Sequence, residues 1–567
     1  MMNIKPAAIR NEVQVILPSG QAYNGVAGTT VEEFILAADL DLGGKIVAAL
    51  VNGQLRELSY SLHNDATLVP VTMKDSDGVR IYRRSLSFLM IVAAQEVFPG
   101  KIITVQHSMP YGGYYNERND GHRLSTAELE ALRSKMVELV QADLSITQVK
   151  VPLDEALQLF RDSGDLEKAD LFSRRRKDYL TLYELAGVRD YFHGFMVPRT
   201  SYLDLFDLRL YGNGFILQFP RRRAPEKLQP FVDEPRLARV FREYDEWLSV
   251  IGVPSVAVLN AAIRAGRMQE VILVAEALHN RQLATIASDI ASCRPALKIV
   301  LISGPSSAGK TTFSKRLAIQ LLAMGIHPVA INMDNYFVDR ELTPRDRNGE
   351  YDFETLEALD VPLFRHHLQM LLAGRKIDTP RYSFQNGKRE LGPELQIGSE
   401  QVMLIEGIHG LNPRIVDGIP PEATYRIFVS AFTQLNLDRH NRVPTTDTRM
   451  LRRIVRDAAR RGYTAADTIK RWPSVRRGEK RHIFPNQSNA NVFFNSALVY
   501  ELSVLKPLAQ PLLLQVENQT PERIEANRLL AFLQWFDPVT VEGIPSDSIL
   551  REFVGGSILE KFEPWRQ

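Results

Sequence analysis

The sequence predicts a multidomain α/β protein whose C-terminal half holds a parallel sheet flanked by helices. Two observations predict this fold class: short, continuously apolar strands alternate with helical stretches from residue 298 onward, and the first 75 residues form a small α+β pattern of their own. The length agrees, because 567 residues correspond to about three or four domains at roughly 150 residues each. A composition of 45% hydrophobic and 24% charged residues is typical of folded chains and excludes a disordered or fibrous one.

The early part of the chain supplies the small α+β module, which we place at residues 1–78. Val13, Val15 and Leu17 alternate with polar residues, as in a half-buried strand. Thr30 followed by Glu33 is typical of a capping box at the start of a helix. Residues 52–53 are Asn-Gly between two strand patterns, which predicts a tight hairpin.

The following residues divide into four further segments. Residues 79–234 are mixed α/β, with helices expected at 85–98 and 124–142. Residues 235–296 are helical in pattern and form a connector that breaks at 252–254. The alternating domain spans 297–520, and a C-terminal helical extension spans 521–567. The apolar strands that predict a parallel sheet covered on both faces lie at 299–302, 329–331, 402–405 and 425–429.

Charge and cysteine content narrow the function classes. The 69 basic and 67 acidic residues nearly cancel, so the chain as a whole is not an obvious nucleic-acid binder. The single cysteine, Cys293, can form neither an internal disulfide nor a cysteine zinc cluster. No run of 18 apolar residues occurs, and no apolar segment precedes the first charges. We therefore expect a cytoplasmic protein without membrane contact.

A complete phosphate-loop motif follows the first strand of the alternating domain. An apolar strand precedes it and a helical pattern follows over 312–324, which is the context that the motif requires. Glycines let backbone N–H groups turn toward a phosphate, the lysine approaches the β- and γ-phosphates, and the threonine hydroxyl binds Mg²⁺. The residues expected to bind the nucleotide are Gly304, Pro305, Ser306, Ser307, Ala308, Gly309, Lys310, Thr311 and Thr312. The cofactors predicted are ATP, with GTP as the alternative, and Mg²⁺.

Two acids follow later strands of the same sheet. Asp334 stands where a parallel strand opens toward the ligand crevice, so it can accept a proton from an acceptor hydroxyl; the alternative is a turn or cap aspartate. Glu406 ends an apolar strand and suits Mg²⁺, and the alternative is an ordinary loop acid.

An arginine-rich helix is expected further along the chain. Spacings of three and four place Arg453, Arg456 and Arg460 on one face. Such a face suits a lid over a transferring phosphate, because guanidinium groups hold two oxygens at once. A solvated or RNA-facing helix is the alternative.

These motifs, in this order and spacing, resemble the uridine kinase and phosphoribulokinase family over about 298–510. The matching segments are residues 304–312, 334–337, 351–353, 380–384, 405–408 and 451–457. The resemblance implies ATP-dependent phosphoryl transfer to the hydroxyl of a nucleoside or related ribose-containing small molecule. The roles that it implies are a general base at Asp334, a ribose contact at Asp352, a base contact at Tyr382, a substrate contact at Arg453, lid arginines at Arg456 and Arg461, catalytic Lys310, and Mg²⁺ ligands at Thr311 and Glu406.

Two positions depart from the family pattern. A base-contacting histidine of the family falls at Gly387, and a lid arginine that touches the pyrimidine falls at Tyr463. The nucleobase contacts are the least preserved part of the resemblance, so the sequence does not identify the acceptor molecule. Losing hydrogen-bonding groups from a polar site costs discrimination.

The N-terminal half resembles the front of threonyl-tRNA synthetase. Residues 11–75 are similar to its ubiquitin-like TGS module and 80–200 to its editing domain. The family's metal or editing positions fall at Arg84, Phe88, Phe192 and Met196, none of which is a usual zinc ligand. We therefore expect that editing chemistry is lost and a binding or regulatory module remains.

The alternative function is an RNA-binding regulatory NTPase that contacts RNA through its N-terminal half. The basic clusters at 174–177 and 221–223 support it, although such clusters are commonly solvated surface. A homo-oligomer also stays open.

Overall fold

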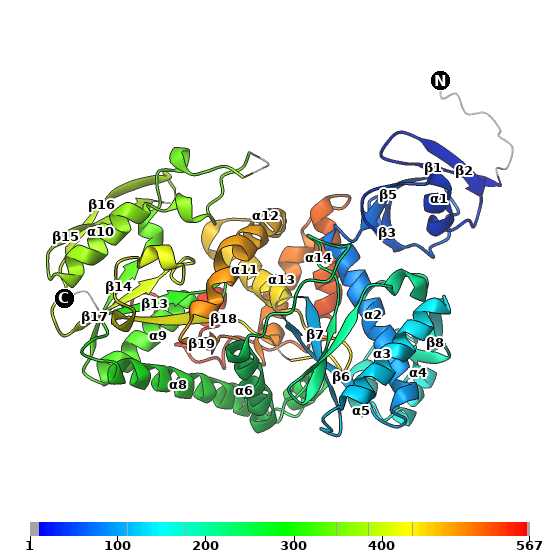
Figure 1. Cartoon of the computed structure of the whole chain (residues 1–567), viewed down its shortest axis with the longest axis horizontal. Helices are drawn as coiled ribbons and strands as arrows, with labels where there is room; N and C mark the ends of the chain where they lie inside the picture. The colour runs from blue at the N-terminus through cyan, green and yellow to red at the C-terminus, as the bar shows by residue number, and fades with distance from the viewer. Residues whose placement is uncertain are drawn as a thin grey trace.

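The computed structural model describes residues 11–109, 112–175, 177–346, 349–383, 385–433 and 435–563. Arg176 of the first basic cluster and Phe384 of the family-like motif lie outside these ranges. Figure 1 shows the N-terminal module at one end of the molecule, the mixed α/β segment beside it, and the parallel-sheet domain at the other end. Among the described residues no helix combines the length and apolar character that crossing a bilayer requires.

The N-terminal module is a five-stranded sheet with one helix, ordered β2-β1-β5-β3-β4. The capping box forms, since Thr30 Oγ1 accepts from the Glu33 N–H at 3.3 Å and the Glu33 carboxylate accepts from the Thr30 N–H at 2.7 Å. Asn52 and Gly53 both have positive φ and join β3 to β4, which confirms the predicted hairpin. The elements are β1 (Glu12–Ile16), β2 (Ala22–Val26), α1 (Val31–Ala38), β3 (Ile46–Val51), β4 (Gln54–Glu57) and β5 (Ala66–Thr72).

The mixed segment contains a four-stranded antiparallel sheet, ordered β11-β12-β7-β6, and a three-stranded sheet, ordered β10-β9-β8. Its first helix, α2 (Ser76–Val97), begins nine residues before the predicted start at 85. The prediction was wrong there because Asp75 accepts hydrogen bonds from the backbone and hydroxyl of Thr72, so strand β5 turns directly into the helix. The other elements are β6 (Ile103–Met109), β7 (Gly113–Arg118), α3 (Thr126–Gln141), β8 (Thr147–Pro152), α4 (Leu153–Asp162), α5 (Leu166–Ser173), β9 (Tyr179–Leu185), β10 (Val188–Asp190), β11 (Asp207–Tyr211) and β12 (Gly214–Gln218).

Three helices form the connector: α6 (Pro235–Ile251), α7 (Val256–Arg264) and α8 (Met268–Ser292). Gly252 has a φ of 71° and ends α6, which confirms the predicted break. A second break, at Gly266 with a φ of 71°, had not been predicted.

The C-terminal half is built on a five-stranded sheet ordered β14-β17-β13-β18-β19, and every neighbouring pair is parallel. The predicted parallel sheet is therefore confirmed. Its strands are buried along most of their length, as expected when helices cover both faces. The strands are β13 (Ile299–Ser303), β14 (His327–Asn332), β17 (Gln401–Glu406), β18 (Thr424–Ser430) and β19 (Val492–Asn495). The helices are α9 (Lys310–Ala323), α10 (Val361–Leu372), α11 (Thr445–Arg461) and α12 (Ala465–Gly478), and an antiparallel hairpin joins β15 (Ile377–Ser383) to β16 (Lys388–Leu395).

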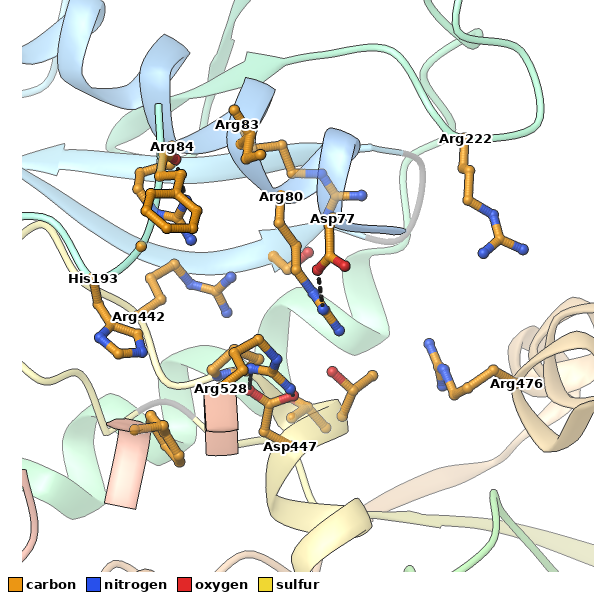
Figure 2. Close-up of a pocket in the computed structure, with 18 of the residues that line it drawn as sticks. Asp77, Arg80, Arg83, Arg84, His193, Arg222, Arg442, Asp447, Arg476 and Arg528 are labelled. Carbon is orange, nitrogen blue, oxygen red and sulfur yellow. Dashed lines mark hydrogen bonds and ion pairs between the residues drawn. The ribbon is translucent and has the colours of Figure 1, made fainter. Parts of the chain in front are cut away.

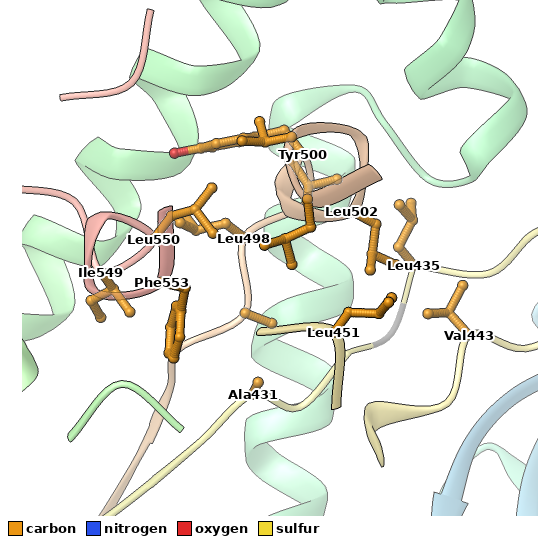
Figure 3. Packing of buried hydrophobic residues seen from close by; sticks show 14 of the residues in the cluster. Ala431, Leu435, Val443, Leu451, Leu498, Tyr500, Leu502, Ile549, Leu550 and Phe553 are labelled. Atoms are coloured by element: carbon orange, nitrogen blue, oxygen red, sulfur yellow. The ribbon is translucent and has the colours of Figure 1, made fainter. Parts of the chain in front are cut away.

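The C-terminal extension packs onto this domain and is helical only in part. After α13 (Glu501–Leu514), the chain has α14 (Pro521–Leu533) and the short α15 (Arg551–Val554), joined by turns among the described residues. Figure 3 shows Ile549, Leu550 and Phe553 packed in the same apolar cluster as Leu451 of α11. The extension therefore shares one core with the parallel-sheet domain.

A buried charge cluster, which we call the interface cluster, joins the mixed segment to the parallel-sheet domain. The Lys168 ammonium lies 2.6 Å from Asp190, 3.4 Å from Asp165 and 3.7 Å from Asp438. His440 Nδ1 lies 2.6 Å from the other Asp190 oxygen. Lys168 is 1% exposed, so these charges face one another away from water.

Candidate functional site

The phosphate loop joins the end of β13 to the start of α9, as the motif predicts. A Cβ at Gly304 would lie 1.9 Å from the carbonyl oxygen of Val429, so only glycine fits there. Gly309 has a φ of 85° and forms the left-handed turn into α9. The Lys310 ammonium donates to the Pro305 carbonyl at 3.2 Å and is held across the loop.

The end of β17 meets this loop. Thr311 Oγ1 donates to Glu406 Oε1 at 2.9 Å. Burial raises the pKa of Glu406 to about 7, while the charge of Lys310 acts to lower it. Hydroxyl and carboxylate oxygens are the hard donors that Mg²⁺ prefers. Thr311 and Glu406 therefore fit the expected ion.

Asp334 lies in the short 3-10 turn η2 (Met333–Tyr336) that follows β14. Its N–H donates to Asn332 Oδ1 at 2.9 Å, which fixes the turn. Burial raises the pKa of Asp334, and Lys310 and Arg461 act in the opposite direction. The fold thus brings the predicted Lys310, Asp334, Glu406 and Arg461 into one electrostatic neighbourhood at the carboxyl ends of the strands.

Three arginines of α11 are held by one buried acid. Asp457 accepts from Arg453 at 3.2 Å and from Arg456 at 3.0 Å, and lies 3.6 Å from Arg461. Arg453 also donates to Ser306 Oγ at 2.9 Å, directly on the phosphate loop. Arg460, which spacing had placed on the same face, lies instead 3.8 Å from the carboxylate of Glu560 in the C-terminal extension.

The predicted acceptor-side residues are more enclosed. Asp352 Oδ1 accepts from the Glu354 N–H at 3.2 Å. Tyr382 is 5% exposed, and its ring centroid lies 5.6 Å from that of Phe337, within an apolar cluster. Its backbone N–H donates to Asn335 Oδ1 at 3.4 Å.

The two positions that depart from the family have other roles here. Gly387 has a φ of 67°, and a Cβ there would lie 2.7 Å from the guanidinium of Arg340. The Tyr463 ring lies under the guanidinium of Arg471, 4.2 Å from the ring centroid.

Sequence reasoning missed three carboxylates around the loop. Glu479 is fully buried and accepts from the Ser306 N–H at 3.2 Å, from Arg449 Nη2 at 2.9 Å, and from Arg476. Glu552, on α15, accepts from the Thr312 N–H at 3.1 Å. Both acids are far from the motif in sequence, so the motif gave no signal for either.

Glu354 is the third missed acid. Its Oε2 atom is buried and has no hydrogen-bond partner within the part of the chain that the structure describes. Burial, followed by the charge of Glu479, raises the pKa of Glu354 to about 7, while Arg453 and Lys310 lower it. Glu354 is therefore close enough to be affected by the charges of both the phosphate loop and Asp352.

In the N-terminal half, the four positions of the family's metal site are occupied by packing groups. The rings of Phe88 and Phe192 lie 5.1 Å apart, and Met196 is 1% exposed. Arg84 donates to the Phe195 carbonyl. These side chains offer no set of metal donors.

The fold and the loop define residues 299–503 as a P-loop domain of the kinase type. These residues match the model of the Phosphoribulokinase / Uridine kinase family, and residues 13–71 match that of the TGS domain. The chain therefore carries a phosphoribulokinase/uridine kinase family domain in its C-terminal half and a TGS domain near its N-terminus.

The N-terminal region is similar to threonine–tRNA ligases. The chain is 30% identical over 198 residues to that of Geobacter sp. (strain M21), covering 35% of this chain and 31% of the relative. It is 31% identical over 198 residues to that of Legionella pneumophila subsp. pneumophila (strain Philadelphia 1), covering 34% and 30%. The chain thus spans about a third of the length of these relatives.

Solved structures similar to part of the chain include two bacterial proteins. A putative fructose transport system kinase from Silicibacter sp. TM1040 has 19% identity and a TM-score of 0.27, covering 37% of this chain and 98% of that one. A possible uridine kinase from Bacillus stearothermophilus has 16% identity and a TM-score of 0.27, covering 38% and 98%.

Proposed function

We propose that the protein transfers the γ-phosphoryl group of ATP to a hydroxyl of a nucleoside or related ribose-containing small molecule. One observation carries the proposal: the phosphate loop, Asp334, Glu406 and the arginines held by Asp457 meet at the carboxyl ends of one parallel sheet. Phosphoryl transfer needs positioning and charge neutralisation more than covalent chemistry, and this set supplies both.

Each residue then has a defined role. Asp334 accepts the proton of the acceptor hydroxyl, and its raised pKa brings it nearer to the working pH, as suits a general base. Lys310 neutralises the terminal phosphates. Mg²⁺, held by Thr311 and Glu406, neutralises phosphate oxygens when bound.

The arginines supply the remaining positive charge. Arg456 and Arg461 neutralise the negative charge of the transferring phosphoryl group. Asp457, which is ion-paired with both, fixes their orientation. Arg453, already bonded to Ser306 Oγ, contacts the substrate, while Asp352 and Tyr382 line the acceptor side.

The acceptor is identified with a panel of nucleosides and sugar phosphates, scored by ADP release. In the presence of the best acceptor, we expect Asp334→Ala to lower turnover at least about a hundredfold while ATP binding is retained. Asp417→Asn, at an exposed acid whose ion pair among the described residues is with Arg365, is the matched control and keeps turnover. Near-normal turnover of Asp334→Ala, or ADP release that no acceptor changes, would refute the assignment.

The similarity to threonine–tRNA ligases supports a second candidate, a regulatory NTPase that contacts RNA through its N-terminal half. Arg222 and Arg223 are exposed basic residues of that half. Such binding falls steeply with salt, so a filter-binding titration of transfer RNA at two salt concentrations tests it. Affinity that is absent at both concentrations eliminates this candidate.

A further inference from the structure

A large cavity lies between the N-terminal half and the parallel-sheet domain, away from the phosphate loop. Its volume is about 1600 Å³, and its walls come from α2, the loop at 221–224, α11, α12 and α14. Figure 2 shows Arg80 and Arg83 of α2, Arg222 of the loop at 221–224 and Arg476 of α12 extending into a common space. Neither the kinase reaction nor the packing of the two halves explains this space.

The lining is strongly positive. Among the described residues it contains twelve arginines and two lysines but only two acids, Asp77 and Asp447. Both acids are already neutralised, because Asp77 lies 2.8 Å from Arg80 and Asp447 lies 2.6 Å from Arg528. Glu525 and Glu479, which lie outside the lining, pair with Arg80, Arg528, Arg449 and Arg476, so the positive charge of the lining is offset only in part.

Three of these cations are free to bind a ligand. Within the described ranges, Arg222, Arg223 and Lys480 have no carboxylate within salt-bridge distance, and all three are exposed to the cavity or its mouth. Desolvation, followed by the charges of Arg476 and Arg222, lowers the pKa of Lys480 to about 7. Like charges brought together in this way are stabilised by a bound anion.

We propose that this cavity is a second binding site, which takes a small molecule bearing several phosphate groups. The cations converge from opposite walls, which suits a compact polyanion; single-stranded RNA is instead bound along a groove that follows its backbone. Arginine forks hold phosphate oxygens two at a time. The volume exceeds that of common small-ligand sites and leaves room for a polyphosphate with an organic group.

The site contacts the kinase machinery through two arginines, Arg449 and Arg476, which both pair with Glu479. Arg449 lines the cavity, donates to the Ser306 carbonyl at 3.1 Å, and pairs with Glu479. Glu479 in turn accepts from the Ser306 N–H. A phosphate that binds Arg449 or Arg476 therefore competes with Glu479, the carboxylate that accepts from the phosphate loop.

Calorimetric titration of the full chain with inorganic tripolyphosphate tests the proposal. All proteins carry Lys310→Ala, which weakens binding at the phosphate loop. We expect Arg222→Glu/Lys480→Glu to reduce the affinity at least about tenfold, because two converging charges are reversed. Lys150→Glu/Arg375→Glu makes the same change in net charge on exposed surfaces outside the cavity, and its affinity stays within about twofold.

Equal affinities for the two double variants, or no binding of tripolyphosphate to the Lys310→Ala chain, would overturn the proposal. So would a single-stranded RNA oligonucleotide that binds the chain where tripolyphosphate fails. If Arg222→Glu/Lys480→Glu does not melt like its parent, Arg222→Ala/Arg223→Ala, at two exposed loop positions, replaces it with the same expectation.

Discussion

Replacing Lys168 by methionine tests whether the interface cluster holds the two halves together. Lys168 is 1% exposed and is surrounded by Asp190, Asp165 and Asp438 at 2.6 to 3.7 Å. Its removal leaves three buried carboxylates without the ammonium that they share. Removing one partner of a buried ion pair costs about 3–5 kcal/mol. We expect the upper part of this range, because three buried acids lose the same ammonium.

The melting temperature shows which unit the cluster stabilises. With an unfolding entropy of roughly 2.1 cal/mol/K per residue, the whole chain has an unfolding entropy of about 1.2 kcal/mol/K. If the whole chain unfolds in one step, the loss of about 3–5 kcal/mol of stability lowers the melting temperature by about 2–4 °C. A unit of roughly 150 residues has about 0.3 kcal/mol/K, so the same loss of stability lowers its melting temperature by about 10–16 °C. Differential scanning calorimetry separates the two outcomes. Lys150→Met, at an exposed lysine of the same segment, is the control and melts like the parent.

The pH dependence gives a second measurement. Burial acts to raise the pKa of Asp190, but the charges of Lys168 and His440 outweigh burial and hold it below its ordinary value. A lowered folded-state pKa contributes stability above the unfolded value, about 3.9, and this contribution is lost as the pH falls through the folded value. The parent should therefore exceed Lys168→Met in stability at pH 7, with a difference that shrinks below about pH 4. A difference under about 0.5 kcal/mol at pH 7 would refute the reasoning.

Two further predictions concern the carboxylates on the phosphate loop. Glu552→Gln removes a negative charge from the Thr312 N–H and should lower the KM for ATP about two- to fivefold in steady-state kinetics, whereas a raised KM would contradict this. Glu479→Gln leaves Arg449 and Arg476 buried without their acid and should lower the free energy of unfolding in urea by about 3–5 kcal/mol, whereas an unchanged urea midpoint would contradict it.

The parts of the fold that could be predicted are those that local sequence determines. The glycine turn of the phosphate loop, the Thr30 capping box and the Asn52-Gly53 hairpin each depend on residues within a few positions of one another. The apolar strands could be assigned to a parallel sheet because strands covered on both faces need no polar alternation.

The missed features depend on contacts between distant segments. Glu552 reaches the Thr312 N–H across 240 positions, and Glu479 reaches Ser306 across 173. The spacing that grouped Arg453 with Arg456 and Arg460 describes an isolated helix, and Asp457 and Glu560 decide which arginines stay together. No periodicity in the sequence carries such information.

In the N-terminal half, the residues near Phe192 contact the parallel-sheet domain. Phe192, at one of the family's metal positions, is followed by His193, whose N–H donates to Asn441 Oδ1 at 3.0 Å. Asn441 in turn donates to the Tyr191 carbonyl at 2.9 Å. The segment after β10 thus contacts the segment that leads into α11.

Helix α11 connects that contact to the phosphate loop. It begins at Thr445 beside the cavity, carries Arg449 against the Ser306 carbonyl, and ends at Arg461 near Asp334. Helix α11 therefore contacts both the cavity and the phosphate loop, and it is the element through which we expect a ligand in the cavity to affect the kinase site. We expect this coupling to need both halves, because the N-terminal half supplies the cavity walls at α2 and the loop at 221–224.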